Sequence, residues 1–240
     1  MHIRIATRRS PLALWQANYV ADELKRIDPT VTTELVKIVS KGDKILDVPL
    51  AKVGGKGLFT KEIDEALADG RADIAVHSMK DVPTELPEGM SICAIPARED
   101  PRDVVATVGG VGLAGLPHGA RVGSSSLRRI CQLKRVYPHL ECVSVRGSVQ
   151  TRLDKMGQEV DAVILAAAGV IRLGLYEKMD GPIDIDLMLP AVGQGTLAIQ
   201  SCNDAAEINA LVTQLNHQDT LDRTLAERAF LATLEGGCQV

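Results

Sequence analysis

Short apolar runs alternate with longer amphipathic stretches along most of the chain. The apolar runs are rich in β-branched residues and predict strands over residues 3–7, 33–39, 72–77, 91–95, 104–108, 121–123, 141–145, 161–166 and 197–202. The amphipathic stretches predict helices over residues 10–26, 58–68, 126–135, 148–155, 168–173 and 220–234. This alternation is typical of an α/β fold built from βα units, with largely parallel sheets.

Local signals sharpen three of these elements. Ser10 followed by Pro11 has the form of a helix cap and first helical residue. The unbroken apolar centre Ile74–Val76 predicts a strand buried on both faces. Asp219 is the expected cap of the last helix, and Gly236 and Gly237 are its expected end.

The last predicted helix has an apolar face that needs a packing partner. Leu221, Leu225, Ala229 and Ala232 fall on that face, and the sequence ends a few residues after it. Either this face packs on the preceding domains, or the chain lacks a further piece.

The alternating pattern is interrupted once and then restarts. Residues 96–103 are charged and carry proline, which is typical of a crossing between domains. The later strand at 197–202 could return to the first sheet. We therefore expect one domain of residues 1–95 with 196–215, and a second of residues 101–190.

Composition places the chain among ordinary soluble globular proteins. It has 240 residues, 45% hydrophobic and only 2% aromatic, so Leu, Val, Ile and Ala must build the cores. The formal charge of −4 argues against nucleic-acid or membrane partners. No signal peptide or apolar run of roughly 18 residues is evident, so we expect a cytoplasmic protein. The five cysteines form no C-x-x-C pair, and we expect neither a disulfide framework nor a metal site.

Basic residues gather at the turns that follow the predicted strands. They are Arg8, Arg9, Lys80, Arg128, Arg129, Arg146 and Arg152. Ligands of open α/β sheets bind outside the carboxyl ends of strands, and helix N-termini favour anions. Together these arginines predict a polyanion, held through carboxylates that a guanidinium can grip with two hydrogen bonds. Taken singly, each could equally be a surface charge paired with a nearby acid.

Two further segments extend this picture. Ser124–Ser126, just before Arg128, can cap the helix or bind an anion. The glycine-rich segment that contains Lys52 and Lys56 lacks phosphate-loop spacing, so a mobile lid over a cleft fits better than a nucleotide site.

The segment His77–Pro83 ends a buried strand and places an ammonium beside a carboxylate. Asp81 is the acid that we expect to face a cationic intermediate, although it could be only a turn residue. His77 is expected to be a buried, hydrogen-bonded strand residue rather than a catalyst.

The last notable residue is Cys238, which follows two glycines in a predicted loop. A thiol without apolar neighbours or a partner is suited to a covalent role. This setting alone leaves a covalent role and an ordinary loop cysteine equally open.

Several long stretches resemble the signatures of one family. Arg8–Ala13, Val53–Phe59, His77–Pro83, Ser125–Arg129, Leu189–Gly195 and Glu235–Val240 are similar to those of the hydroxymethylbilane synthase family, also called porphobilinogen deaminase, and occur in the family's order. The resemblance implies two domains like those of periplasmic binding proteins and a small third α/β domain, which residues 218–240 would begin. It implies a monomeric transferase that joins four porphobilinogen molecules with loss of ammonia, on a dipyrromethane cofactor bound to Cys238 by a thioether.

The resemblance also assigns roles to residues, with Asp81 as the catalytic acid. The cofactor would be held by Ser78, Lys80, Ser124, Ser126, Arg128, Arg129, Arg146 and Gly147. The substrate would be held by Arg8, Ser10, Gln16, Arg146, Arg152 and Arg172, with Lys52 and Lys56 in the lid.

Two departures from the family pattern matter. Ser148 stands where the family usually has asparagine, and both residues can cap a helix. Family members also continue for several dozen residues beyond the cysteine. Two rival hypotheses remain: a non-catalytic anion-binding protein of the periplasmic-binding type, and, more weakly, a nucleotide-dependent enzyme.

Overall fold

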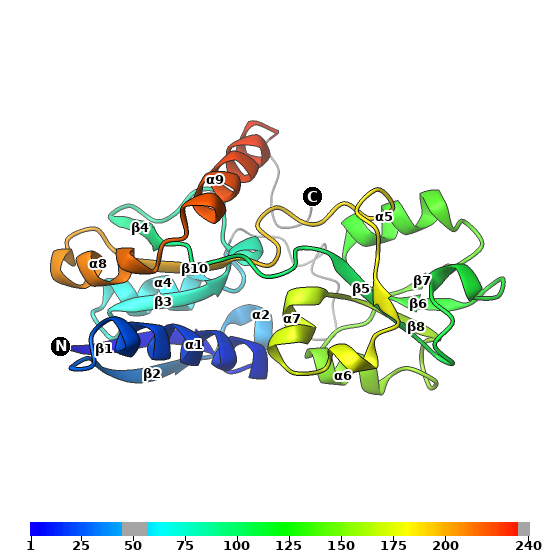
Figure 1. Ribbon diagram of the computed structural model, residues 1–240, viewed down its shortest axis with the longest axis horizontal. Coiled ribbons are helices and arrows are strands. Elements are labelled where there is room, and N and C mark those ends of the chain that lie inside the picture. The colour runs from blue at the N-terminus through cyan, green and yellow to red at the C-terminus, as the bar shows by residue number, and fades with distance from the viewer. Residues whose placement is uncertain (45–56, 235–240) are drawn as a thin grey trace. The chain divides into compact units, whose positions relative to one another are not determined.

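The computed structural model describes residues 1–44 and 57–234, which form two compact units. Unit 1 contains residues 1–44, 57–99 and 196–234, and unit 2 contains residues 100–195 (Figure 1). The chain passes from unit 1 to unit 2 between Glu99 and Asp100, inside the segment that the sequence marks as a crossing.

Unit 1 is built on a five-stranded sheet in the order β2-β1-β3-β10-β4. Its strands are β1 (His2–Arg8), β2 (Thr32–Ile38), β3 (Ile74–Ser78), β4 (Met90–Ala94) and β10 (Leu197–Cys202). The prediction that residues 197–202 return to the first sheet is confirmed. The prediction of largely parallel pairing is wrong for β10, which runs antiparallel to β3 and β4. Leu197 enters beside Ser78, the last residue of β3, so β10 has to run back along β3.

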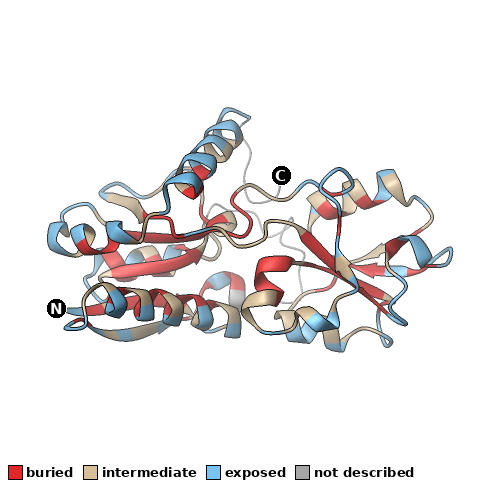
Figure 2. Ribbon diagram, viewed as in Figure 1, coloured by how far each residue is buried: buried red, intermediate tan, exposed pale blue. Residues whose placement is uncertain are grey.

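Helices cover both faces of this sheet. They are α1 (Pro11–Ile27), α2 (Lys41–Lys44), α4 (Lys61–Ala68), α8 (Ala206–Val212) and α9 (Gln218–Thr233), with 3-10 turns η1 (Met79–Asp81) and η4 (Thr213–Leu215). α1 begins as predicted, with the Ser10 hydroxyl accepting from the Ala13 N–H and Pro11 in the first turn. The core on the α1 side contains Ile74 and Val76, and the core on the α4 side contains Ala75, so β3 is buried on both faces as predicted (Figure 2).

Helix α9 differs from its prediction in two ways. Its cap position is His217, not Asp219. Its buried residues are Thr220 and Thr224, whereas Leu225 is 54% exposed. Of the two alternatives for the apolar face, packing on the preceding domains holds for Leu221, which packs against a buried cluster of unit 1, but not for Leu225. Polar contacts of the helix with unit 1 are described below.

Unit 2 is built on a second five-stranded sheet, in the order β7-β6-β8-β5-β9. Its strands are β5 (Asp103–Thr107), β6 (Arg121–Gly123), β7 (Glu141–Val143), β8 (Ala162–Ala166) and β9 (Gly181–Pro182). Its helices are α5 (Leu127–Val136), α6 (Val149–Asp154) and α7 (Ala167–Arg172), with 3-10 turns η2 (Leu113–Gly115) and η3 (Tyr176–Lys178). β6 is parallel to β7 and β8, but β5 is antiparallel to β8 and β9, so this sheet is mixed too.

Separate apolar clusters cover the two faces of the second sheet. Among the described residues of the whole chain, no helix is both long and apolar enough to span a membrane.

Candidate active site

A small pocket of about 70 Å³ opens in unit 1 where β1 and β3 end. Its lining contains residues from α1 and its cap, from the start of α4, and from η1: Arg8, Ser10, Leu12, Ala13, Gln16, Phe59, Thr60, Val76, His77, Ser78 and Asp81. The carboxyl ends of neighbouring parallel strands lie at the same edge of a sheet, which is why residues so far apart in sequence meet here. Five predicted site residues, Arg8, Ser10, Gln16, Ser78 and Asp81, are brought together by this edge.

A hydrogen bond between uncharged groups and a stacking contact fix polar side chains of the pocket. The Gln16 amide donates to the Ser78 hydroxyl at 2.9 Å, which joins α1 to the end of β3. The Arg8 guanidinium lies over the Phe59 ring, 4.2 Å from its centroid. Stacking on an aromatic face fixes the direction of an arginine side chain. The sequence pattern placed Phe59 in a family motif but gave no reason to pair it with Arg8.

His77 is buried, as predicted, but it also lines the pocket. Burial lowers the pKa of His77 to about 4, helped by the charge of Arg8 and opposed by the Gln200 amide. The imidazole is therefore neutral at pH 7. Its Nε2 atom and the hydroxyl of Thr60 are buried without a hydrogen-bond partner in the described structure, so the predicted hydrogen bonding of His77 is absent at Nε2.

Lys80 and Asp81 lie in the 3-10 turn η1, directly after β3. The turn closes with the Val82 N–H donating to the Met79 carbonyl. Met79 is buried, and its N–H donates to the Thr196 carbonyl at 2.9 Å. The backbone that carries Asp81 is thus anchored on one side to the strand that returns from unit 2.

In unit 2, the predicted arginine pair meets a buried carboxylate. Arg128 donates to Asp103 Oδ2 at 2.7 Å, and Arg129 donates to Asp103 Oδ1 at 2.7 Å. Gln194 adds a third donor to Asp103 Oδ1 at 2.9 Å. Burial alone would raise the pKa of Asp103, but the charges of Arg129 and Arg128 more than offset it and lower the pKa. Asp103 carried no signal at the level of sequence, because a single acid at the start of a strand is common.

The neighbouring serines serve as caps and turn residues. Ser126 accepts from the Arg129 N–H and caps α5, and Ser124 accepts from the Ser126 N–H. This confirms the capping role of Ser126, and leaves its binding of an anion as a prediction.

The segment from Arg146 to Arg152 forms a tight turn into α6. Ser148 caps the helix by accepting from the Thr151 N–H, as expected from its residue type. Gly147 has a φ of +117°, and a Cβ there would lie 2.8 Å from a Thr151 carbon, so this turn requires glycine. Arg152 donates to the Gly147 carbonyl at 3.0 Å, which holds its guanidinium beside the turn.

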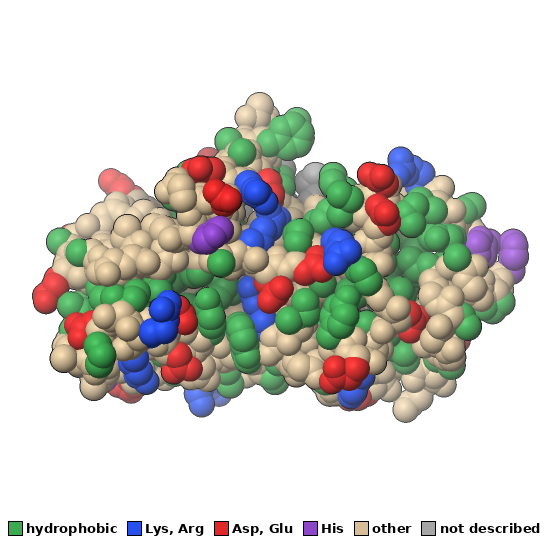
Figure 3. All heavy atoms as spheres, viewed as in Figure 1, with side chains coloured by type: hydrophobic (Ala, Val, Ile, Leu, Met, Phe, Trp, Pro, Cys, Tyr) green, Lys and Arg blue, Asp and Glu red, His purple; other side chains and the backbone are tan. Residues whose placement is uncertain are grey.

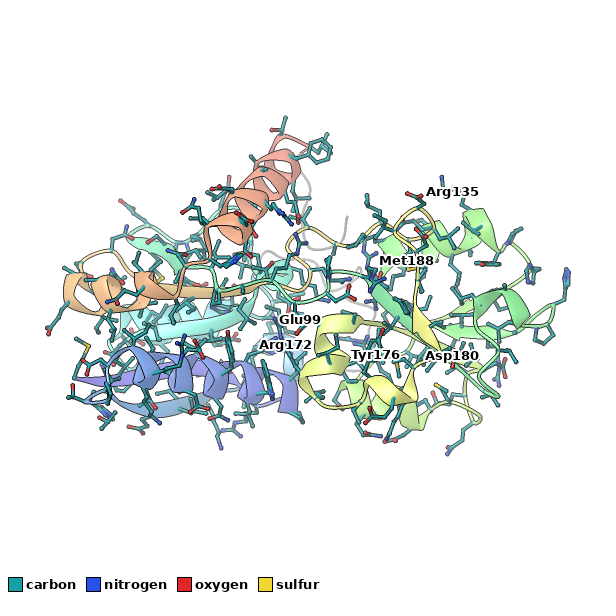
Figure 4. All side chains as sticks on the ribbon, in the orientation of Figure 1. Glu99, Arg135, Arg172, Tyr176, Asp180 and Met188 are labelled. Atoms are coloured by element: carbon teal, nitrogen blue, oxygen red, sulfur yellow. The ribbon has the colours of Figure 1, made fainter. Side chains whose placement is uncertain are left out.

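Arg172 projects from the end of α7 (Figure 4) and donates to the Gly195 carbonyl at 2.7 Å. Gly195 is the last residue of unit 2 before the chain returns to unit 1. Lys52, Lys56 and Cys238 lie outside the described residues.

The side chains of both units suit a ligand with several carboxylates. In unit 2, two guanidinium groups share one carboxylate, which leaves a net positive charge near Ser126, the residue that caps α5. In unit 1, a cation, a carboxylate and buried polar atoms surround the pocket. Figure 3 shows acidic and basic side chains interspersed on the face it displays, so the attraction for a polyanion is local rather than a property of the whole surface.

Comparison with solved structures defines the class of fold. The methionine binding protein MetQ superposes with a TM-score of 0.56 at 12% identity, over 95% of each chain. The VFT2 domain of Bordetella pertussis BvgS gives a TM-score of 0.51 at 15% identity, over 95% of this chain and 92% of that domain. The fold is thus that of the periplasmic-binding-protein-like α/β domains, as expected from the sequence.

Comparison with sequences defines the family. The family described as "Porphobilinogen deaminase, dipyromethane cofactor binding domain" matches residues 3–210. Porphobilinogen deaminases of Geobacter sp. (strain M21) and Geobacter sulfurreducens are 55% and 54% identical over 239 residues, covering 99% of this chain and 75% of each relative. The chain belongs to the porphobilinogen deaminase family.

Proposed function

We propose that this chain catalyses the porphobilinogen deaminase reaction, a transfer that joins four porphobilinogen molecules into the linear tetrapyrrole hydroxymethylbilane. The observation that carries this proposal is the match of the family's cofactor-binding domain to residues 3–210, the span that contains both the pocket and the arginine pair. The rival hypothesis of a non-catalytic anion-binding protein is not favoured, because it rests on fold likeness alone.

Each addition breaks one C–N bond of a porphobilinogen and forms one C–C bond. Ammonia leaves the aminomethyl carbon, and a cation remains on the substrate. The α-carbon of the acceptor pyrrole attacks that cation and then loses its proton. The dipyrromethane cofactor, when bound, would supply the first acceptor ring. Water would break the bond between this primer and the completed tetrapyrrole, which would leave with a hydroxymethyl end.

Asp81 is the residue proposed to stabilise the positive charge that develops on the substrate. Its carboxylate would accept hydrogen bonds from pyrrole N–H groups and stabilise the cation left when ammonia departs. It would also carry protons between the departing ammonia and the ring carbon. Its position in the lining of the pocket that also contains the strand-end arginine Arg8 supports this role.

The other predicted residues would bind and orient carboxylates. Arg8, Ser10, Gln16, Arg152 and Arg172 would hold the substrate. The cofactor would be held by Ser78, Lys80, Ser124, Ser126, Arg128, Arg129 and Gly147, with Arg146 shared and Cys238 as the attachment point. Buried Arg129 is proposed to act mainly by setting the direction of Arg128, since both contact Asp103. Lys52 and Lys56 would belong to the lid.

The proposal includes the setting of the enzyme. We infer a cytoplasmic monomer without nucleic-acid, membrane or metal partners, with domains of residues 1–95 plus 196–215, 101–190, and a third that begins at residue 218. The passage between the two units after Glu99 and again after Gly195 supports the first two of these domains.

The test combines turnover with the intact mass of the protein. After incubation with porphobilinogen, the wild-type chain should gain the mass of a dipyrromethane, and Asp81→Asn should gain it too. Removing a group that transfers protons costs roughly 10²–10⁴-fold, so tetrapyrrole formation by Asp81→Asn should fall by that factor. A wild-type chain that keeps its bare mass and forms no product would refute the proposed function. Normal turnover by Asp81→Asn would refute only the role of Asp81.

A further inference from the structure

One side chain of α9 binds the loop that immediately follows Asp81. The guanidinium of Arg228 donates from Nη1 to the Val82 carbonyl at 3.1 Å. From Nη2 it donates to the Pro83 carbonyl at 2.6 Å and reaches the Thr84 carbonyl at 3.4 Å. Three successive carbonyls, the first one residue beyond Asp81, thus converge on one arginine.

Burial of the Val82 side chain in a cluster with Met79 and Ala198 fixes one end of this loop, but it does not satisfy the backbone carbonyls. The turn η1 ends at Asp81, and no helix or strand follows until β4 begins at Met90. Pro83 has no N–H to donate, and partly buried carbonyls need a donor. A planar guanidinium with several N–H groups in a fixed fork can satisfy adjacent carbonyls at once, which a lysine ammonium cannot do with the same geometry.

The helix that carries Arg228 is itself held in place by the residues next to it. Glu227 forms an ion pair with Arg98, whose second guanidinium nitrogen donates to the other carboxylate oxygen at 3.2 Å. The backbone N–H of Arg98 donates to the hydroxyl of Thr220, in the first turn of α9, at 3.1 Å. These contacts hold α9 on unit 1, and they therefore fix the position from which Arg228 reaches the loop.

Besides the burial of Met79 and Val82, hydrogen bonds hold the turn that carries Asp81 on both sides. On one side, the Met79 N–H donates to the carbonyl of Thr196, the residue just before β10. On the other side, Arg228 binds the carbonyls that follow. Loss of the Arg228 hydrogen bonds would let the Asp81 carboxylate move relative to Arg8 and Ser78, while no residue of the pocket lining is itself substituted.

We propose that Arg228 is a positioning residue for the deaminase reaction, which fixes the Asp81 carboxylate by binding the backbone carbonyls of Val82, Pro83 and Thr84. The inference rests on the proposed function. Arg228 does not act on substrate; it acts through the placement of Asp81.

Arg228→Met removes the donors while keeping an unbranched side chain. Displacement of a catalytic group by about 1 Å can cost on the order of 10²-fold, so we expect kcat to fall by about that factor, with KM within about threefold of wild type. The cofactor mass should be retained. Arg223→Met, an exposed arginine of the same helix, is the matched control and should keep wild-type turnover. Arg228→Lys should recover only part of the loss, because it can reach one carbonyl but not three.

A double-mutant cycle with Asp81→Asn separates positioning from general damage. If Arg228 acts through Asp81, Arg228→Met should cause almost no further loss of single-turnover rate in the Asp81→Asn background. Full additivity of the two losses, or near-normal turnover by Arg228→Met, would overturn the inference. If Arg228→Met fails to fold by circular dichroism, the same cycle run with Arg228→Lys decides. An inactive wild-type enzyme would instead contradict the proposed function.

Discussion

The two units share one architecture and use charged residues in opposite ways. In unit 2, Arg128 and Arg129 converge on Asp103, whose side chain is 0% exposed. In unit 1, the polar groups at the corresponding strand ends line a pocket and are oriented by an aromatic ring and neutral hydrogen bonds. A buried carboxylate fixes two like charges side by side, which would otherwise repel each other.

The difference separates two tasks. A pair of guanidinium groups with one shared carboxylate is a stiff, net positive platform, suited to a permanently bound polyanion. A pocket with a neutral imidazole, a carboxylate and an arginine offers groups whose interactions can change as a reaction proceeds. Three substitutions test whether this contrast between platform and pocket is real.

The largest effect is expected at the centre of the platform. Asp103→Ala leaves Arg128 and Arg129 without their shared carboxylate, and breaking a buried ion pair costs about 3–5 kcal/mol. The free energy of unfolding from urea denaturation should fall by that amount. Asp100→Ala, which removes a more exposed pair with Arg102, should cost less than about 1 kcal/mol. Equal losses of unfolding free energy in the two variants would mean that the ion pairs of Asp103 contribute no more than an exposed ion pair does.

The second effect concerns the neutral imidazole of the pocket. The pKa of His77 in the folded protein is about 4, below the ordinary value of 6.5. The unfolded chain therefore binds the extra proton between these values, and the folded protein loses stability as pH falls from about 6.5 towards 4. One proton corresponds to a slope of at most about 1.4 kcal/mol per pH unit.

Substitution identifies the source of that slope. His77→Gln should remove most of it when urea denaturation is repeated from pH 4 to pH 7. An unaltered slope in His77→Gln would show that the imidazole is already protonated or solvated in the folded protein.

The smallest effect tests the aromatic support of Arg8. Phe59→Leu removes the ring face that lies 4.2 Å from the guanidinium carbon, an interaction that is worth about 1 kcal/mol when partly shielded. This corresponds to roughly a fivefold rise in KM for porphobilinogen, with kcat little changed. Phe230→Leu, at a ring 65% exposed on α9, serves as the control. If Phe59→Leu and Phe230→Leu change KM equally, the Phe59 ring does not support substrate binding by Arg8.

Much of the fold followed from local patterns. The strand at Arg121–Gly123 was predicted with the bounds that the structure has, because turn-forming residues lie on both sides of it, with Gly119 before and Ser124 after. The start of α1 followed from Ser10 and Pro11. The helix α8 and the two-residue strand β9 were missed, since such short elements leave little periodicity to detect.

The candidate site was predicted in its residues but not in their partners. Arg8 and Asp81 could be placed at one sheet edge, because parallel strands bring their carboxyl ends together. The role of Asp103 beneath the arginine pair, and of Thr60 and His77 in the pocket, could not be predicted. Those contacts join residues with no shared local signal.

The sequence by itself determined the alternation of strands and helices, the caps of α1, α5 and α6, the family and the candidate site residues. These depend on neighbours within a few positions, or on motifs that can be recognised as continuous stretches of sequence. Only the tertiary structure decided that β10 runs antiparallel beside β3, that Arg129 is buried on Asp103, and that Arg228 reaches the loop after Asp81. Such contacts depend on how distant segments fold back on one another, and the direction of a returning strand or the donor that satisfies a carbonyl is fixed by that packing.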